Sequence, residues 1–234
     1  MNKLIQQTND LFKSSGIPYA ICGGFALDIF AGKKLREHGD FDVLIFEEDK
    51  RCAVQFLLDK NWTAYGRFML EGKLLTQHLF HKINNISDSF WDDCKNVWAV
   101  QPNNLMVLEK VERLQGEIYT YQSREWLVKD ELEFIELEFD TKDGSDYVVQ
   151  EFPRITRPLD KAILYRDGIP YLAPEIILFY KSDNYLSQSP YAKPKTQEDF
   201  KNIVPLLSES SVKWLKEAVN TAYPDGYEWL GGLL

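Results

Sequence analysis

Cysteine is scarce in this 234-residue sequence, which holds only Cys22, Cys52 and Cys94. The number is odd and no two of them form a C-x-x-C pair, so we expect no disulfide framework and a reducing, cytoplasmic environment. The uncharged stretch from 14 to 27 contains Pro18 and three glycines and is too short to span a bilayer. The first ten residues carry no apolar signal core, so we expect no association with membranes.

Basic residues are outnumbered, with 27 Lys and Arg against 36 Asp and Glu, and the formal net charge is −9. The sequence also lacks the Lys/Arg runs that proteins use to grip a nucleic acid backbone, so nucleic acid is not an expected partner. Acidic residues gather between 129 and 146, where eight Asp or Glu stand beside two Lys. This segment is either a solvated strand edge and turn or a negatively charged surface that attracts cations, which could be metal ions or a polycationic substrate.

The spacing of apolar residues changes along the chain. Before about residue 155 short apolar strands alternate with helices, and from Pro174 onward the periodicity is helical. Hydrophobic residues make up 44% of the sequence, which is ordinary for a globular protein with a buried core. We therefore predict an α/β (α+β) fold, with a mixed β-sheet flanked by helices in residues 1–155 and a mainly helical domain in residues 156–234.

Apolar periodicity, glycines and prolines together predict the individual elements. Helices are expected at 2–15, 25–30, 48–60, 105–115, 174–185, 197–207 and 210–221, with a loop at 187–195. Strands are expected at 19–22, 41–46, 62–70 and 132–139. Hairpin turns are expected at Asp143-Gly144 and Asp167-Gly168, and a turn at Gly23-Gly24.

Two aspartates stand two residues apart on the strand predicted around Phe41. Side chains with this spacing leave a strand on the same face, so the carboxylates of Asp40 and Asp42 converge and suit Mg²⁺ better than a core. Gly23 and Gly24 lack side chains that would keep a phosphate from their N–H groups, and the next helix adds its positive end. These parts suit nucleotidyl transfer, in which two metal ions stabilise charge on the attacked phosphate and on the leaving pyrophosphate.

A third carboxylate usually completes the set of metal ligands in such a site. The strand at 132–139 offers Glu136 and Glu138 on one face, with Asp140 just beyond it. We favour Glu136, because its neighbours in the strand are apolar, and the other two carboxylates stay open as alternatives.

Residues 23–42 read G-G-x-A-L-D-x-x-x-G-x-x-x-R-x-H-x-D-x-D, which resembles the opening signature of the aminoglycoside nucleotidyltransferases, within the DNA polymerase β-like nucleotidyltransferase superfamily. The segment 167–181 is similar to the D-G-I-P-Y-L-x-P-E-x-x-L-x-Y-K run of that family, and 199–207 is similar to its later D-F run. Three positions depart from the family pattern: Phe25 in place of Trp, Glu136 where many relatives have Asp, and Thr196 where an acid is common.

The resemblance implies a role for each matching residue. Gly23 and Gly24 would line the triphosphate, and Asp40, Asp42 and the later carboxylate would hold two Mg²⁺ ions. Arg36 and Lys181 would be phosphate contacts, since each is a cation placed near a motif, and His38 would touch the nucleotide. For His38 a second reading, a packing residue that positions Asp40, stays open.

The activity that the resemblance implies is transfer of a nucleoside monophosphate from a nucleoside triphosphate, with ATP as the expected donor. The acceptor would be a hydroxyl of a small molecule, such as an aminoglycoside or a lincosamide antibiotic, and the acidic segment favours a cationic one. Two alternatives stay open: a nucleotidyltransferase that modifies tRNA or protein, and a non-catalytic nucleotide-binding relative. Whether a homodimer completes the acceptor pocket is also open.

A zinc site at His78, His81 and Cys94 is disfavoured. The two histidines would share a face of a helix, but no fourth ligand stands at a suitable spacing.

Overall fold

The computed structural model describes residues 2–68, 79–87, 94, 96–102, 108–110, 118–121, 131–186 and 192–224. The chain forms two compact units, each built from two segments. Unit 1 comprises Met1–Tyr19 and His38–Phe139, and unit 2 comprises Ala20–Glu37 and Asp140–Leu234. The predicted domains, 1–155 and 156–234, stay a prediction, because this division reflects packing and not independent folding.

Unit 1 begins with helix α1, Lys3–Lys13. The side chain of Asn2 caps this helix by accepting a hydrogen bond of 2.8 Å from the backbone N–H of Leu4. Leu4, Ile5 and Phe12 lie buried on one side of α1, as their spacing predicts. The helix is followed by Gly16 at φ 72°, a left-handed conformation that favours glycine.

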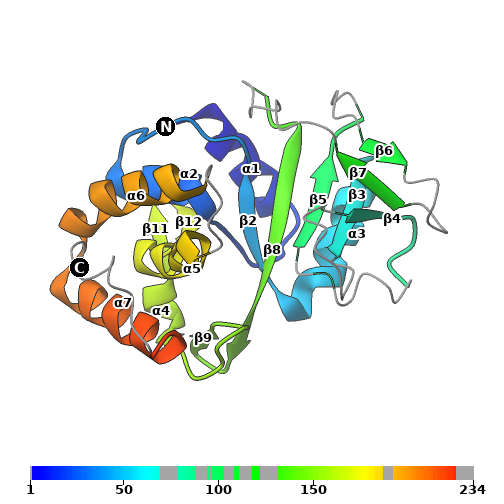
Figure 1. Cartoon of the computed structure of the whole chain (residues 1–234). Coiled ribbons are helices and arrows are strands. Elements are labelled where there is room, and N and C mark those ends of the chain that lie inside the picture. Colours follow the sequence, from blue (N-terminus) through cyan, green and yellow to red (C-terminus); the bar gives the residue numbers. More distant parts are fainter. Residues whose placement is uncertain are drawn as a thin grey trace. The chain divides into compact units, whose positions relative to one another are not determined.

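The sheet of unit 1 carries the candidate site. Its strands lie in the order β2 (Asp42–Phe46), β8 (Phe134–Asp143), β5 (Asn96–Val100), β3 (Thr63–Phe68), β4 (Leu79–Ile83), β7 (Ile118–Tyr121) and β6 (Leu108–Lys110). The long strand β8 lies between β2 and β5 (Figure 1). A 3₁₀ turn, η1 (Glu47–Asp49), and helix α3 (Lys50–Asp59) follow β2, and α3 packs against β2 and β3.

Alternation along β5 and β8 separates the two faces of this sheet. Val97, Ala99, Ile135 and Leu137 are fully buried on one face. In the antiparallel register of the two strands, Trp98 stands opposite Glu136 and Asn96 opposite Glu138, on the other face. An aromatic cluster of Phe80, Trp98 and Phe134 packs on that second face. The acids of β8 therefore stand beside apolar neighbours.

Unit 2 has a small mixed sheet of its own. Strand β1 (Tyr19–Ile21) pairs in parallel with β12 (Ile169–Leu172), which pairs antiparallel with β11 (Ile163–Arg166). The β11–β12 turn has positive φ at Asp167 and Gly168, which matches the predicted hairpin. The second predicted hairpin joins the end of β8 to β9 (Asp146–Val148), with φ 57° at Gly144, and β9 pairs with β10 (Thr156–Pro158).

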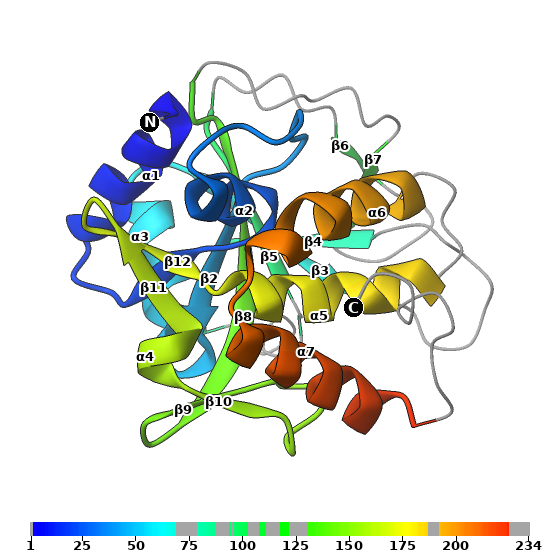
Figure 2. The ribbon, with the colours of Figure 1, turned by 90° about the vertical axis from the view of Figure 1, so that its left-hand side faces the viewer.

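The helices of unit 2 are α2 (Gly23–Ala31), α4 (Leu159–Ala162), α5 (Pro174–Leu186), α6 (Ala192–Ile203) with the 3₁₀ turn η3 (Val204–Leu206), and α7 (Glu209–Ala222). Helix α5 contacts α2, α6 and α7 (Figure 2). At the C-terminal end of α2, Gly32 is left-handed, and the guanidinium of Arg166 donates to the carbonyls of Ile29 and Phe30. This cation therefore caps the negative end of α2.

The predicted α/β architecture is confirmed, and three local predictions are wrong. Gly23-Gly24 is not a separate turn, because both residues open α2. In the predicted helix 105–115, residues 108–110 form β6, because pairing with β7 outweighs the helical periodicity, and the remainder lies outside the described residues. Helix α6 begins inside the predicted loop, at Ala192. The disfavoured zinc site would have required His81 to lie on a helix, but His81 lies on strand β4. His78 lies outside the described residues.

No helix in the described part of the chain combines the length and the apolar character that crossing a membrane requires.

Candidate active site

Three carboxylates converge in unit 1. Asp42 is the first residue of β2, Asp40 lies two residues before it, and Glu136 lies on the adjacent strand β8. One carboxylate oxygen from each of the three lies within 4.8 Å of the others. The backbone N–H of Glu136 donates a 2.9 Å hydrogen bond to the carbonyl of Phe41, which fixes the register of β8 beside the aspartates. The predicted pair and the favoured third acid therefore meet at one point.

The three carboxylates differ in their exposure to solvent. Asp40 is exposed, Asp42 is half-buried, and Glu136 retains a relative accessibility of only 9%. Burial raises the pKa of Glu136, and the negative charge of the nearby Asp40 raises it further. Burial and the charges of Glu136 and Asp42 raise the pKa of the neighbouring Glu138 well above its usual range. Placing this many carboxylates together raises the free energy of the folded protein unless a proton or a bound cation neutralises part of their charge.

The donor set fits a divalent cation. Carboxylate oxygens from two adjacent strands are the hard ligands that Mg²⁺ takes, and the exposed Asp40 leaves the cluster open toward solvent. Of the described His, Cys, Asp and Glu residues, these three form the group that is close enough to share an ion. Their role as ligands stays a proposal.

Asp140, an alternative third acid, is engaged elsewhere. Its carboxylate accepts hydrogen bonds from the phenol groups of Tyr147 and Tyr180, the latter at 2.7 Å, inside unit 2. Glu138 remains near the cluster, since its pKa responds to the charges of Glu136 and Asp42. The structure thus groups Glu136, and not Asp140, with the two aspartates.

The glycine pair lies in unit 2, at the start of α2. Gly23 has φ 59°, a conformation that a residue with a side chain rarely adopts. Cys22 precedes the helix and makes no side-chain capping hydrogen bond. The nine-residue helix α2 therefore begins without the Ser, Thr, Asp or Asn cap that usually satisfies the first N–H groups.

Two predicted phosphate contacts, Arg36 and Lys181, share one buried carboxylate. Asp199 accepts two hydrogen bonds from the Arg36 guanidinium, at 2.9 and 3.0 Å, and pairs with Lys181 Nζ at 3.0 Å. Burial alone would raise the pKa of Asp199, but the Arg36 hydrogen bond and the Lys181 charge outweigh it and lower that pKa. Asp199 therefore binds both cations within unit 2.

Other residues from the motifs have structural contacts. Asp28 accepts a 2.9 Å hydrogen bond from the backbone N–H of Leu35, which orients the loop after α2. His38 is buried two residues before Asp40. Glu175 lies in the first turn of α5 as expected, but its carboxylate also pairs with Arg157 and accepts from Ser211. That buried ion pair joins β10, α5 and α7 within unit 2.

Sequence reasoning missed Asn96, a polar residue near the carboxylates. Its side-chain amide donates to Glu136 Oε1 from the start of β5. The available signal was a single polar residue at the head of the apolar run 97–100, but residues 96–100 were not predicted as a strand, so no partner on β8 could be assigned.

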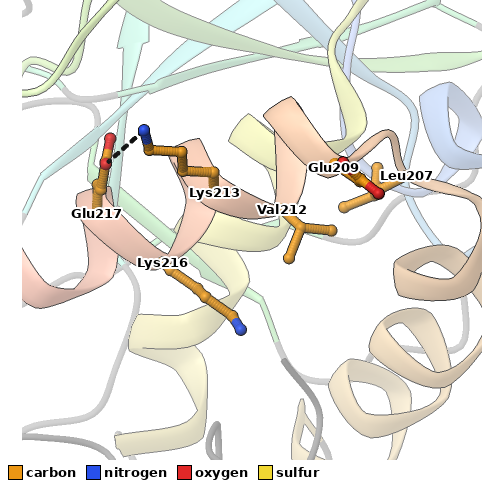
Figure 3. Close-up of a pocket in the computed structure, with 6 residues that line it drawn as sticks. All are labelled: Leu207, Glu209, Val212, Lys213, Lys216 and Glu217. Atoms are coloured by element: carbon orange, nitrogen blue, oxygen red, sulfur yellow. Dashed lines mark ion pairs between the residues drawn. The ribbon is translucent and has the colours of Figure 1, made fainter.

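A surface hollow lies along α7 of unit 2 (Figure 3). Its lining includes Lys213 and Glu217, an exposed ion pair with an N–O distance of 3.8 Å. Exposed side chains of both signs are typical of a solvated helix face, so we assign no ligand to this hollow.

Asp140 provides a test of the electrostatics of unit 2. Burial raises the pKa of Asp140 from 3.8 to about 6. Because the folded protein then binds this proton more tightly than the unfolded chain, the free energy of unfolding falls as the pH rises from about 4 to about 6, by about 3 kcal/mol for this group. In Asp140→Asn this contribution should be absent. Urea unfolding of both proteins at pH 4 and pH 7 measures it, and equal pH dependence in the two would contradict the assignment.

Comparison with known proteins gives one match in sequence and several in structure. Residues 4–82 match the family model described as aminoglycoside-2''-adenylyltransferase, a range that includes the glycine pair and both aspartates but ends before Glu136. No protein of curated function matches the sequence significantly.

The structural matches span nearly the whole chain. The solution structure of the antibiotic-resistance factor ANT(2'')-Ia has a TM-score of 0.51 at 15% identity, covering 95% of this chain and 92% of that one. The crystal structure of ANT(2'')-Ia in complex with adenylyl-2''-tobramycin has a TM-score of 0.51 at 16% identity, covering 94% and 98%. Lincomycin-bound LnuA, a lincosamide antibiotic adenylyltransferase, has a TM-score of 0.42 at 15% identity, covering 94% and 98%.

At these identities the likeness to ANT(2'')-Ia demonstrates the fold, while the family model demonstrates a shared sequence pattern. The resemblance to the aminoglycoside nucleotidyltransferases is therefore confirmed, in sequence over residues 4–82 and in fold over most of the chain.

Proposed function

We propose that the protein is a metal-dependent nucleotidyltransferase that moves a nucleoside monophosphate, AMP from ATP, to a hydroxyl group of a small antibiotic-like molecule. The observation that carries this proposal is the convergence of Asp40, Asp42 and Glu136 within 4.8 Å at the edge of β2 and β8. The fold shared with ANT(2'')-Ia and the family match over the segment that contains both aspartates support it.

Asp40, Asp42 and Glu136 would hold the divalent cations, two Mg²⁺ ions in this class of reaction. Bound Mg²⁺ would neutralise charge on the triphosphate and on the departing pyrophosphate. The N–H groups at the start of α2, from Gly23 and Gly24, would approach phosphate oxygens, where the positive end of the helix favours an anion. Arg36 and Lys181, both paired with Asp199, are the proposed cationic contacts to phosphate.

The acceptor class follows from charge and from the relatives. A net charge of −9 and the acidic strand β8 favour a cationic acceptor over an anionic one. The crystal structure of ANT(2'')-Ia is a complex with adenylyl-2''-tobramycin, and the family model that matches residues 4–82 is described as an aminoglycoside adenylyltransferase. We therefore place aminoglycosides first and lincosamides second among the candidate acceptors.

One assay tests the proposal and separates it from the alternatives. The protein is incubated with Mg²⁺, each labelled nucleoside triphosphate in turn and a panel of aminoglycosides and lincosamides, and pyrophosphate release is measured. Release that requires one of the antibiotics, and is greatest with ATP, is the expected result. Label on tRNA or on protein would instead support a macromolecular acceptor. Nucleotide binding without any release would support a non-catalytic relative.

A further inference from the structure

Asn96 is a buried polar residue beside the proposed cation site. It opens strand β5, and only 4% of its surface is accessible. The residues that follow it in the strand, from Val97 to Val100, are all buried and apolar. Because a buried amide without a hydrogen bond costs free energy, the contacts of this side chain need an explanation.

The two ends of the Asn96 amide differ in their contacts. The Nδ2 group donates to Glu136 Oε1, whereas the Oδ1 atom is buried and has no hydrogen-bond partner among the described residues. A buried acceptor without a hydrogen bond destabilises the folded protein, and an apolar side chain of similar size at position 96 would avoid this cost. Packing alone therefore does not account for an amide at position 96. We look for its role in the hydrogen bond that the Nδ2 group donates.

The direction of that hydrogen bond is informative. In the register of β5 and β8, Asn96 stands opposite Glu138, with which its side chain also hydrogen-bonds, and its amide reaches diagonally to donate to Glu136. Glu136 is the carboxylate grouped with Asp40 and Asp42. The Asn96 amide thus restrains the Glu136 carboxylate, which would be the third ligand of the cation.

From this geometry we infer that Asn96 is a positioning residue, which orients the Glu136 carboxylate toward the divalent cation shared with Asp40 and Asp42. The inference rests on the proposed function, because it assumes that this cluster binds a cation. Partners that hydrogen-bond to a metal-ligating side chain fix its orientation, and their loss typically reduces metal affinity about 10–100-fold.

The test measures binding of Mn²⁺ alone to the full-length chain by titration calorimetry, without nucleotide or antibiotic. Asn96→Leu keeps the approximate side-chain volume and removes the donor, so it should weaken Mn²⁺ binding about 10–100-fold. Asn96→Gln keeps an amide N–H on a longer arm and should recover most of the affinity. A role confined to packing would predict no such recovery.

A matched control is Asn9→Leu. Asn9 is 8% exposed in α1, and its side chain accepts a 2.8 Å hydrogen bond from Tyr19 far from the acidic strand in sequence. This variant should lose thermal stability but bind Mn²⁺ as the wild type does. Should Asn96→Leu fail to fold, Asn96→Ser provides the comparison, since its hydroxyl is too short to reach Glu136.

A double-substitution cycle separates an action through Glu136 from a direct one. In a Glu136→Ala background, which keeps Asp40 and Asp42, Asn96→Leu should have no further effect on Mn²⁺ affinity. Unchanged Mn²⁺ binding in a folded Asn96→Leu protein would overturn the inference, and so would an equal loss in both backgrounds. A wild type that binds no Mn²⁺ is a different result, which would overturn the cation site and the proposed function.

Discussion

Asp42→Ala should reduce antibiotic-dependent pyrophosphate release by about 10²–10³-fold or more, the loss expected when one group that stabilises transition-state charge is removed. Asp42 is central to the cluster, because it opens β2 and lies within 4.8 Å of both Asp40 and Glu136. Without its carboxylate the remaining two cannot hold two cations in one geometry. Steady-state release of pyrophosphate with the best antibiotic acceptor measures the effect.

The same variant should remain folded. Asp42 is half-buried among like charges, and its charge raises the pKa of Glu138, so its removal relieves repulsion within the cluster. We expect the melting temperature of Asp42→Ala without metal to equal or exceed that of the wild type, whereas the stabilisation by added Mg²⁺ should be lost. Asp59→Ala, on the exposed end of α3, is the control and should keep both properties. Turnover near the wild-type rate in Asp42→Ala would exclude this site.

Local signals account for the parts of the site that the sequence predicted. The i, i+2 spacing of Asp40 and Asp42 requires only strand periodicity, and the alternation from 132 to 139 requires only the same rule applied to β8. The hairpin at Asp167-Gly168 requires only that these residues accept positive φ. Each of these features depends on a few neighbouring residues, so a single sequence contains the information.

Long-range pairings account for what was missed. The hydrogen bond from Asn96 to Glu136 joins residues forty positions apart in the sequence. It depends on the register of β5 against β8, which short-range spacing does not reveal. Asp199 was recognised only as part of a motif, because its two cations lie on α5 and in the loop after α2. A strand as short as β6 is set by its partner β7, so its own helical periodicity was misleading. Such contacts depend on the tertiary fold, which spacing along the chain does not encode directly.

Asp199→Ala should be the most destabilising single substitution proposed for this protein, at about 3–5 kcal/mol, the cost of removing one partner from a buried ion pair. Asp199 is 1% exposed, and its loss leaves Arg36 and Lys181, both largely buried, as two cations without their shared anion. The measurement is urea unfolding at pH 7. Since the pKa of Asp199 is lowered in the folded protein, this stabilisation is present at pH 7 and is lost as the pH falls through the folded pKa.

The control for Asp199→Ala is an ion pair of the same chemistry on the surface of α7. Lys213 and Glu217 are separated by 3.8 Å, with side chains 76% and 65% exposed, so Glu217→Ala should cost less than about 1 kcal/mol. Because Arg36 and Lys181 are proposed to contact phosphate, Asp199→Ala should also raise the KM for ATP in the fraction of protein that remains folded. A loss of stability no larger than that of Glu217→Ala would show that the two cations find other partners, and that Asp199 does not hold them in place.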